Sequence, residues 1–108
     1  MEKIKVIVKR PDEEYGHMTW ISNTLKNLQR TVEGFIETVN LDDNGLVMIC
    51  NEDGKFNGSD ANFKMTAPII DVIFGTVIIC GTSEDEFANV PIDLQTWKNM
   101  LGAWGNEI

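Results

Sequence analysis

His17 is the residue of this 108-residue chain best suited to proton transfer or metal binding, and it is the only histidine. No cysteine or second histidine stands at ligand spacing from it, so a metal site would have to rely on carboxylates alone. General-base catalysis would also need a nucleophile and an orienting group, and the sequence proposes neither. A small hydrolase that combines His17 with Asp71 or Glu52 is the one enzyme left open. We expect a protein without catalytic residues, bound metal or cofactor.

The segment 51–55, Asn-Glu-Asp-Gly-Lys, superficially resembles a calcium-binding loop. Such a loop needs oxygen ligands at alternating positions, and Lys55 stands where one of them is required. The glycines of this region also lack the Gly-Lys-Ser/Thr ending of a phosphate-binding loop. The two cysteines, Cys50 and Cys80, each lie in an apolar run, which predicts buried thiols and fits a reducing cytoplasm.

Indole rings and polar loop side chains favour binding over catalysis. Three tryptophans exceed what a core of valine and isoleucine needs. Trp97 is predicted to lie in the core and Trp104 to be exposed near a glycine-rich end. Asparagine and lysine side chains after residue 50 could contact a ligand, with Trp20 or Phe63 as a stacking surface. The predicted ligand- or partner-binding residues are Trp20, Asn51, Glu52, Lys55, Asn57, Asn62, Phe63 and Trp104.

Nine basic and seventeen acidic residues give the chain a net charge of -8. That charge repels a phosphate backbone, so direct binding to nucleic acid is not expected. The acidic residues gather in turn-like segments at 12–14, 42–43, 52–53 and 84–86. They form either a rim that keeps the protein soluble or a face that docks on a basic partner. No apolar stretch reaches the roughly 20 residues that span a bilayer, so no membrane association is expected.

The strands that must position these residues are predicted from alternating polar and apolar side chains. The pattern predicts a strand over 3–9, with its apolar residues facing inward, and a second strand over 17–21 that pairs with it. A hairpin follows over 35–41 and 46–50, because Asn44-Gly45 is a typical hairpin turn between them.

Residues 22–34 have the signals of a helix. Ser22 and Asn23 are suitable N-cap residues, and Gly34 provides the C-terminal stop. The apolar residues predicted to share one helical face are Leu25, Leu28 and Val32.

The second half of the chain is predicted to contain the longest loop, over 55–67. In the apolar run that follows, Gly75 marks either a bulge or a tight turn between two short strands, and we favour a strand from about residue 72 that is disturbed at Gly75. After a polar segment over 83–89, Asp93 is a suitable N-cap for a C-terminal helix. Its predicted apolar face consists of Leu94, Trp97, Met100, Leu101 and Trp104. The order predicts a single α+β domain over 1–108, with a mainly antiparallel sheet of about five strands and two helices, one central and one C-terminal.

Four segments carry a family resemblance beyond this periodicity: 34–39, 43–46, 50–55, and 71–76 ahead of Gly81. Together they resemble the domain of unknown function 3846 family, which occurs in phages, prophages and mobile elements, largely of Gram-positive bacteria. The likeness runs from about Ile4 to the C-terminal helix. It departs from the family pattern over 56–67, where relatives carry a shorter or proline-bearing segment ending in Asn-Arg and this chain has Ala61-Asn62-Phe63-Lys64. The resemblance implies an accessory protein of a phage or mobile element, and it supplies no activity.

Three functions are compatible with these observations. The first is a non-enzymatic binding protein that blocks or sequesters a host component, for example in counter-defence. It would act through an acidic face on a host protein or through a pocket for a nucleotide-like signal. The second is an assembly module in which Trp97, Met100 and Trp104 form the interface of a homo-oligomer. The third is the hydrolase described above.

Overall fold

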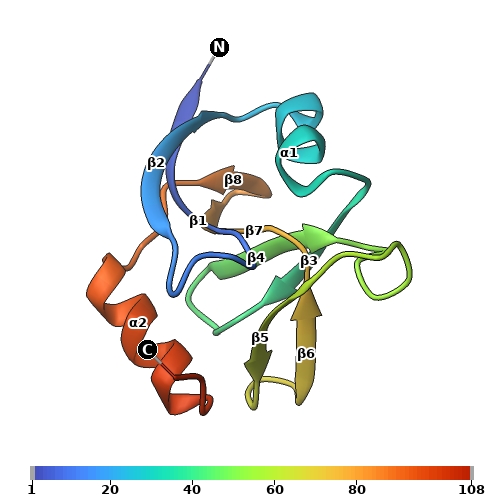
Figure 1. The fold of residues 1–108 in the computed structure, drawn as a ribbon. Coiled ribbons are helices and arrows are strands. Elements are labelled where there is room, and N and C mark those ends of the chain that lie inside the picture. Colours follow the sequence, from blue (N-terminus) through green and yellow to red (C-terminus); the bar gives the residue numbers. More distant parts are fainter. Residues whose placement is uncertain (1, 108) are drawn as a thin grey trace.

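The computed structural model describes residues 2–107, and within them six strands form one antiparallel sheet (Figure 1). Each neighbouring pair is antiparallel. The β1–β2 and β3–β4 pairs are hairpins with short connections, whereas β7 pairs with β1 and β4, which lie much earlier in the chain. The spatial order is β2 (His17–Ser22), β1 (Lys3–Lys9), β7 (Val77–Ser83), β4 (Leu46–Asn51) and β3 (Ile36–Asn40), and β8 (Glu86–Ala88) pairs with β7.

Both faces of this sheet are covered. One face packs against α1 (Leu25–Val32), which contributes Leu28 and Val32 to the core. The other face is covered by a two-stranded antiparallel sheet, β5 (Ala61–Met65) and β6 (Asp71–Phe74), and by α2 (Leu94–Ala103). The predicted α+β class, with two helices and a mainly antiparallel sheet, is therefore confirmed.

The strongest sequence patterns folded as predicted. In β1 the alternating residues Ile4, Val6 and Val8 are buried against α1. The β3–β4 turn places Gly45 at φ 89°, a left-handed conformation that glycine adopts without a Cβ penalty. The carboxylate of Asp42 accepts hydrogen bonds from the backbone N–H groups of Asn44 (2.8 Å) and Leu46 (3.0 Å), which fixes the turn.

The predicted start of α1 was wrong by one or two residues. Thr24 is the N-cap, and its hydroxyl accepts a hydrogen bond from the N–H of Asn27 at 3.2 Å. Leu25 was assigned to the buried face but is exposed, because the helix begins at this residue and turns it away from the sheet. Gly34 follows the helix as predicted.

The region predicted as one loop over 55–67 was also wrong, since it contains β5. Phe63 and Met65 alternate with exposed residues and are buried, but only because β6 lies beside them. Gly75 separates two short strands, as in the alternative that we did not favour, and does not disturb one continuous strand. At φ 81° it connects β6 in the small sheet to β7 in the large one. The polar segment 83–89 likewise contains β8, behind a turn in which Glu84 and Asp85 have positive φ.

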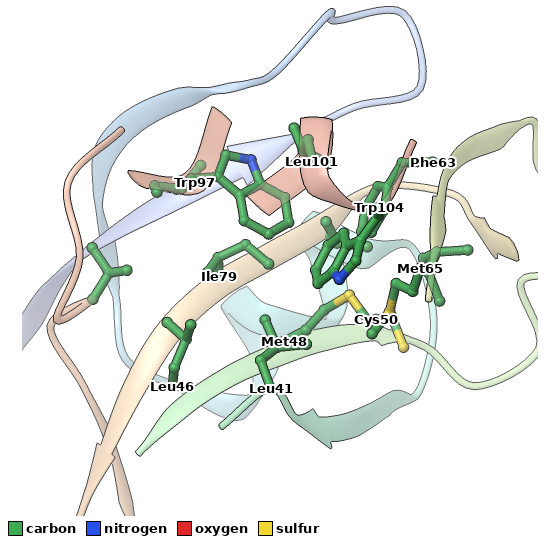
Figure 2. Close-up of a cluster of buried hydrophobic side chains, with 14 residues drawn as sticks. Leu41, Leu46, Met48, Cys50, Phe63, Met65, Ile79, Trp97, Leu101 and Trp104 are labelled. Atoms are coloured by element: carbon green, nitrogen blue, oxygen red, sulfur yellow. The ribbon is translucent and has the colours of Figure 1, made fainter. Parts of the chain in front are cut away.

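An aromatic cluster fills the space between β5 and α2 (Figure 2). Phe63 is stacked on Trp104, with centroids 5.9 Å apart and an interplanar angle of 8°, and both meet Trp97 edge-on. Trp97 also donates an indole hydrogen bond to the carbonyl of Tyr15 at 2.9 Å.

The prediction of Trp104 as an exposed contact residue is therefore wrong, and so is that of Phe63 as a stacking surface for a ligand. Trp104 is 7% exposed and Phe63 5%. The rings of Phe63 and Trp104 bury each other. The two residues are far apart in the chain, so the sequence around either one does not predict this contact. The homo-oligomer face proposed for Trp97, Met100 and Trp104 is likewise turned inward against the sheet.

Candidate functional site

A pocket with a volume of about 260 Å3 lies where the end of β4 and the following turn face β6. Its floor comes from β3 and β4, its far wall from β6, and its mouth from the turn over 52–56. The lining residues are Glu37, Cys50, Asn51, Glu52, Gly54, Lys55, Phe56, Asp71, Val72, Ile73 and Phe74.

Asn51 holds the end of β4 and the following turn in place through side-chain hydrogen bonds. Its side-chain amide donates to the carbonyls of Val32 and Glu33, both at 3.1 Å, and its oxygen accepts from the N–H of Asp53 at 2.7 Å. Gly34 makes this possible, because a Cβ there would lie 2.5 Å from the Asn51 amide nitrogen. The buried side chain thus joins the C-terminal end of α1 to the start of the turn.

The floor combines a carboxylate with a protonated thiol. Glu37 and Cys50 are cross-strand partners in the β3–β4 ladder, so their side chains lie on the same face of the sheet. The thiol of Cys50 donates to a carboxylate oxygen of Glu37 at 3.8 Å. Burial, together with the Glu37 charge, raises the pKa of Cys50 to about 12, so the sulfur is not a thiolate at neutral pH. This state does not suit a nucleophile.

The lining of the pocket as a whole is acidic. Lys55 donates to a carboxylate oxygen of Asp71, and this hydrogen bond holds the pKa of Asp71 below its usual value. Glu37 and Glu52 also line the pocket, so the lining holds three carboxylates and one ammonium group. An excess of negative charge is therefore present even with the Lys55–Asp71 pair formed.

Exposed apolar side chains occur in this lining and in the segment that precedes Asp71. Phe56 is 87% exposed and Val72 is 42% exposed, and both are lining residues. Ile69 and Ile70, in the β5–β6 connection that precedes Asp71, are also exposed. Large apolar groups grouped at a pocket are typical of a surface that binds another molecule.

A family model described as Domain of unknown function (DUF3846) matches residues 4–102. The chain belongs to this family. Comparisons with curated proteins and with solved structures gave no match. In this member of the family, the pocket takes its residues from segments that lie within the matched range.

Three of the eight predicted binding residues meet at the pocket: Asn51, Glu52 and Lys55. Their assignment as ligand contacts stays a prediction. Asn57 lies in the turn beyond the lining, where its side-chain oxygen accepts from the N–H (3.0 Å) and the hydroxyl (2.6 Å) of Ser59. Trp20 lies on the edge strand β2, and it is exposed but is not a lining residue.

Asn62 serves the fold and is not a pocket residue. Its amide donates to the carbonyls of Lys9 (2.9 Å) and Gly75 (2.8 Å), and its oxygen accepts from the Lys9 ammonium at 2.6 Å. Burial lowers the pKa of Lys9, although the charges of Glu13 and Asp12 oppose this shift. Asn62 therefore satisfies a buried ammonium group between β1 and β5.

The catalytic pairing left open by the sequence does not form around the pocket. His17 lies at the start of β2, where its Nδ1 is 2.7 Å from a carboxylate oxygen of Glu13, and it is not a lining residue. Within residues 2–107, no group of three or more metal-ligating side chains is assembled. The same part of the chain contains no helix with the length and apolar character that crossing a bilayer requires.

Sequence reasoning missed Glu37, Phe56 and Val72 as pocket residues. Glu37 had one usable signal, because the predicted β3–β4 hairpin places it opposite Cys50, immediately before the segment 51–55. Val72 had none, since its position depends on how β6 packs over the large sheet.

Proposed function

We propose that this protein binds a basic segment of a partner protein in the pocket between β4 and β6. The observation that carries the proposal is the excess of carboxylates in the lining, three against one ammonium, beside an exposed apolar border. A lysine or arginine side chain fits such a mouth, and its apolar neighbours fit Phe56 and Val72.

The charge of the pocket favours this partner over a nucleotide-like ligand. A phosphate would meet the carboxylates of Glu37 and Glu52 and find only Lys55 as a cation, already paired with Asp71. Asn62 and Phe63, expected to help hold such a ligand, are engaged in the fold. Of the two modes of binding considered from the sequence, docking on a basic protein is therefore the better supported.

Lys55 indicates where a foreign cation would bind. Its side chain is about half exposed and reaches Asp71 across the mouth, so it acts as an internal ligand of the carboxylate. A partner's ammonium or guanidinium group would share Asp71 or displace Lys55 toward solvent. Such an exchange between exposed groups is inexpensive, since exposed ion pairs are each worth roughly 0–1 kcal/mol.

The biological role we propose is the one that the family resemblance implied. The protein would be an accessory protein of a phage or mobile element that acts in the host cytoplasm without catalysis. It would block the host protein to which the basic segment belongs, for example in counter-defence. In that compartment Cys50 and Cys80, both buried, would remain free thiols.

The test uses short peptides in which arginine alternates with valine, and matched peptides with the uncharged isostere citrulline in place of arginine. We expect amide resonances of the isotope-labelled protein to shift around Glu37, Glu52 and Val72 with the arginine peptides only. Glu52→Gln and Glu37→Gln should each weaken binding several-fold. Asp43→Asn, which removes the same charge at the tip of the β3–β4 turn, should not. Equal binding of the citrulline peptides would contradict the proposal.

A further inference from the structure

β2 is an edge strand with free backbone groups. Within residues 2–107 it pairs with β1 alone and forms one end of the large sheet, seen beside β1 in Figure 1. Unpaired strand edges readily accept another strand, and proteins usually block them with charges or proline. The sequence of β2 is His-Met-Thr-Trp-Ile-Ser, which contains neither proline nor any Lys, Arg, Asp or Glu.

The direction of the free groups follows from the neighbouring strand. The N–H and the carbonyl of Lys5 are bonded to Asn89 Oδ1 and to the N–H of Val90, both at 2.8 Å, so they point away from β2. Lys5 is opposite Trp20, and this is therefore a non-hydrogen-bonded pair of the β1–β2 ladder. The backbone groups of Trp20 must then point outward, as must those of Met18 and Ser22, two residues away on either side.

Of these three residues, Ser22 already has hydrogen-bond partners for its backbone carbonyl. Its carbonyl accepts from the N–H of Thr24 at 2.9 Å and from the side chain of Asn27 at 3.2 Å. Met18 and Trp20 are left to offer an outward N–H and carbonyl each. This spacing is self-complementary for an antiparallel partner with the same sequence, because a two-fold axis at Thr19 brings Met18 of each copy opposite Trp20 of the other.

Two exposed apolar side chains flank this edge. Trp20 is 56% exposed on the sheet face shared with Lys5, and Leu25 is 58% exposed at the start of α1, which covers the opposite face. The charge distribution also favours this edge for self-association. A chain with a net charge of -8 repels its own copies, and β2 contains no acidic residue.

We propose that a second copy of this chain pairs with β2, antiparallel and centred on Thr19, so that the two large sheets become one continuous sheet. Met18 and Trp20 would supply the hydrogen-bonded pairs, and Trp20 and Leu25 would be covered on the two faces. None of the residues that line the β4–β6 pocket lies on β2, so this dimer is independent of the proposed binding function.

The register gives a direct test by disulfide cross-linking. Thr19 would face Thr19 of the second copy in a non-hydrogen-bonded pair, with Cα atoms about 4.5 Å apart, within the ~4.4–6.8 Å that a disulfide spans. Thr19→Cys should therefore form a cross-linked dimer on mild oxidation. Ser22→Cys, displaced along the same edge, should not. The native cysteines are buried and leave the background low. Equal cross-linking of both variants, or of neither, would overturn the proposal.

Sedimentation of the unmodified chain is the second test. We expect a concentration-dependent dimer that is strengthened by added salt, because salt screens the repulsion between two acidic copies. Trp20→Lys should shift it to monomer, whereas Phe35→Lys, the same change at another exposed aromatic residue, should leave the dimer intact. A monomer at every concentration, or a dimer unaffected by Trp20→Lys, would overturn the assignment. Peptide binding at the pocket should be unchanged in Trp20→Lys, so the two proposals can fail separately.

Discussion

Asn51 shows how a single side chain holds the pocket in place. It is buried, and its amide and oxygen bind three backbone groups from α1 and from the turn after β4. The close approach also requires Gly34, the residue that the sequence identified as a helix stop. The interpretation of Asn51 as a ligand contact could not anticipate this role, because the carbonyls that it binds lie almost twenty residues earlier.

Asn51→Asp tests this role. The carboxylate would present an oxygen to the carbonyls of Val32 and Glu33, so two hydrogen bonds would be lost in a buried place. We expect a loss of about 3 kcal/mol in the free energy of unfolding, measured by urea denaturation. Asn57→Asp adds the same charge at an exposed position and should stay within about 0.5 kcal/mol of the parent. Similar midpoints for the two variants would contradict the role of Asn51.

The Lys55–Asp71 pair predicts a pH dependence. Because Lys55 lowers the pKa of Asp71 in the folded state, the pair stabilises the fold above the unfolded value of 3.8. That contribution is lost as the pH falls through the lower, folded pKa. The difference in unfolding free energy between the parent and Asp71→Asn should therefore be constant at neutral pH and disappear in strong acid. A difference independent of pH would show that Asp71 stabilises the fold by some other means.

At the scale of elements, sequence patterns were reliable where one element contains its own signal. The alternation in β1, the Asn44-Gly45 turn and the N-cap Asp93 each act over a few residues, and each was confirmed. β5 was missed because the burial of Phe63 and Met65 depends on β6 and on α2. The pocket was only partly predicted for the same reason. Asn51, Glu52 and Lys55 lie within the single segment 51–55, whereas Glu37 and Asp71 come from other strands.

The aromatic cluster should determine whether β5 and β6 stay on the sheet. Phe63→Ala removes one ring from the contacts with Trp97 and Trp104 and leaves a cavity, so we expect a loss of roughly 3–5 kcal/mol. Amide exchange in β5, β6 and α2 should accelerate most, since these elements share the cluster. Phe56→Ala, at an exposed ring, should change stability little. Uniform loss of protection across the molecule would instead indicate that these elements unfold together with the large sheet.

At the scale of the whole molecule, charge separates the two proposed interactions. The net charge of -8 opposes self-association and attracts a basic partner. Added salt should therefore strengthen the β2-mediated dimer and weaken peptide binding at the pocket. Sedimentation and calorimetry of the same protein across one salt series measure both trends. If added salt changed the affinity of the dimer and the affinity for the peptide in the same direction, at least one of the two surfaces would have been assigned the wrong partner.

The most direct measurement of the central claim is a calorimetric titration of the arginine–valine peptide into Lys55→Met. Removing the internal cation leaves the carboxylates of Asp71, Glu37 and Glu52 in the pocket without a competing ammonium group. We predict that the variant binds the peptide several-fold more tightly than the parent protein does, and that the citrulline peptide gains nothing. Binding that is unchanged or weakened by Lys55→Met would contradict the claim that the carboxylates of this pocket hold a partner's cation.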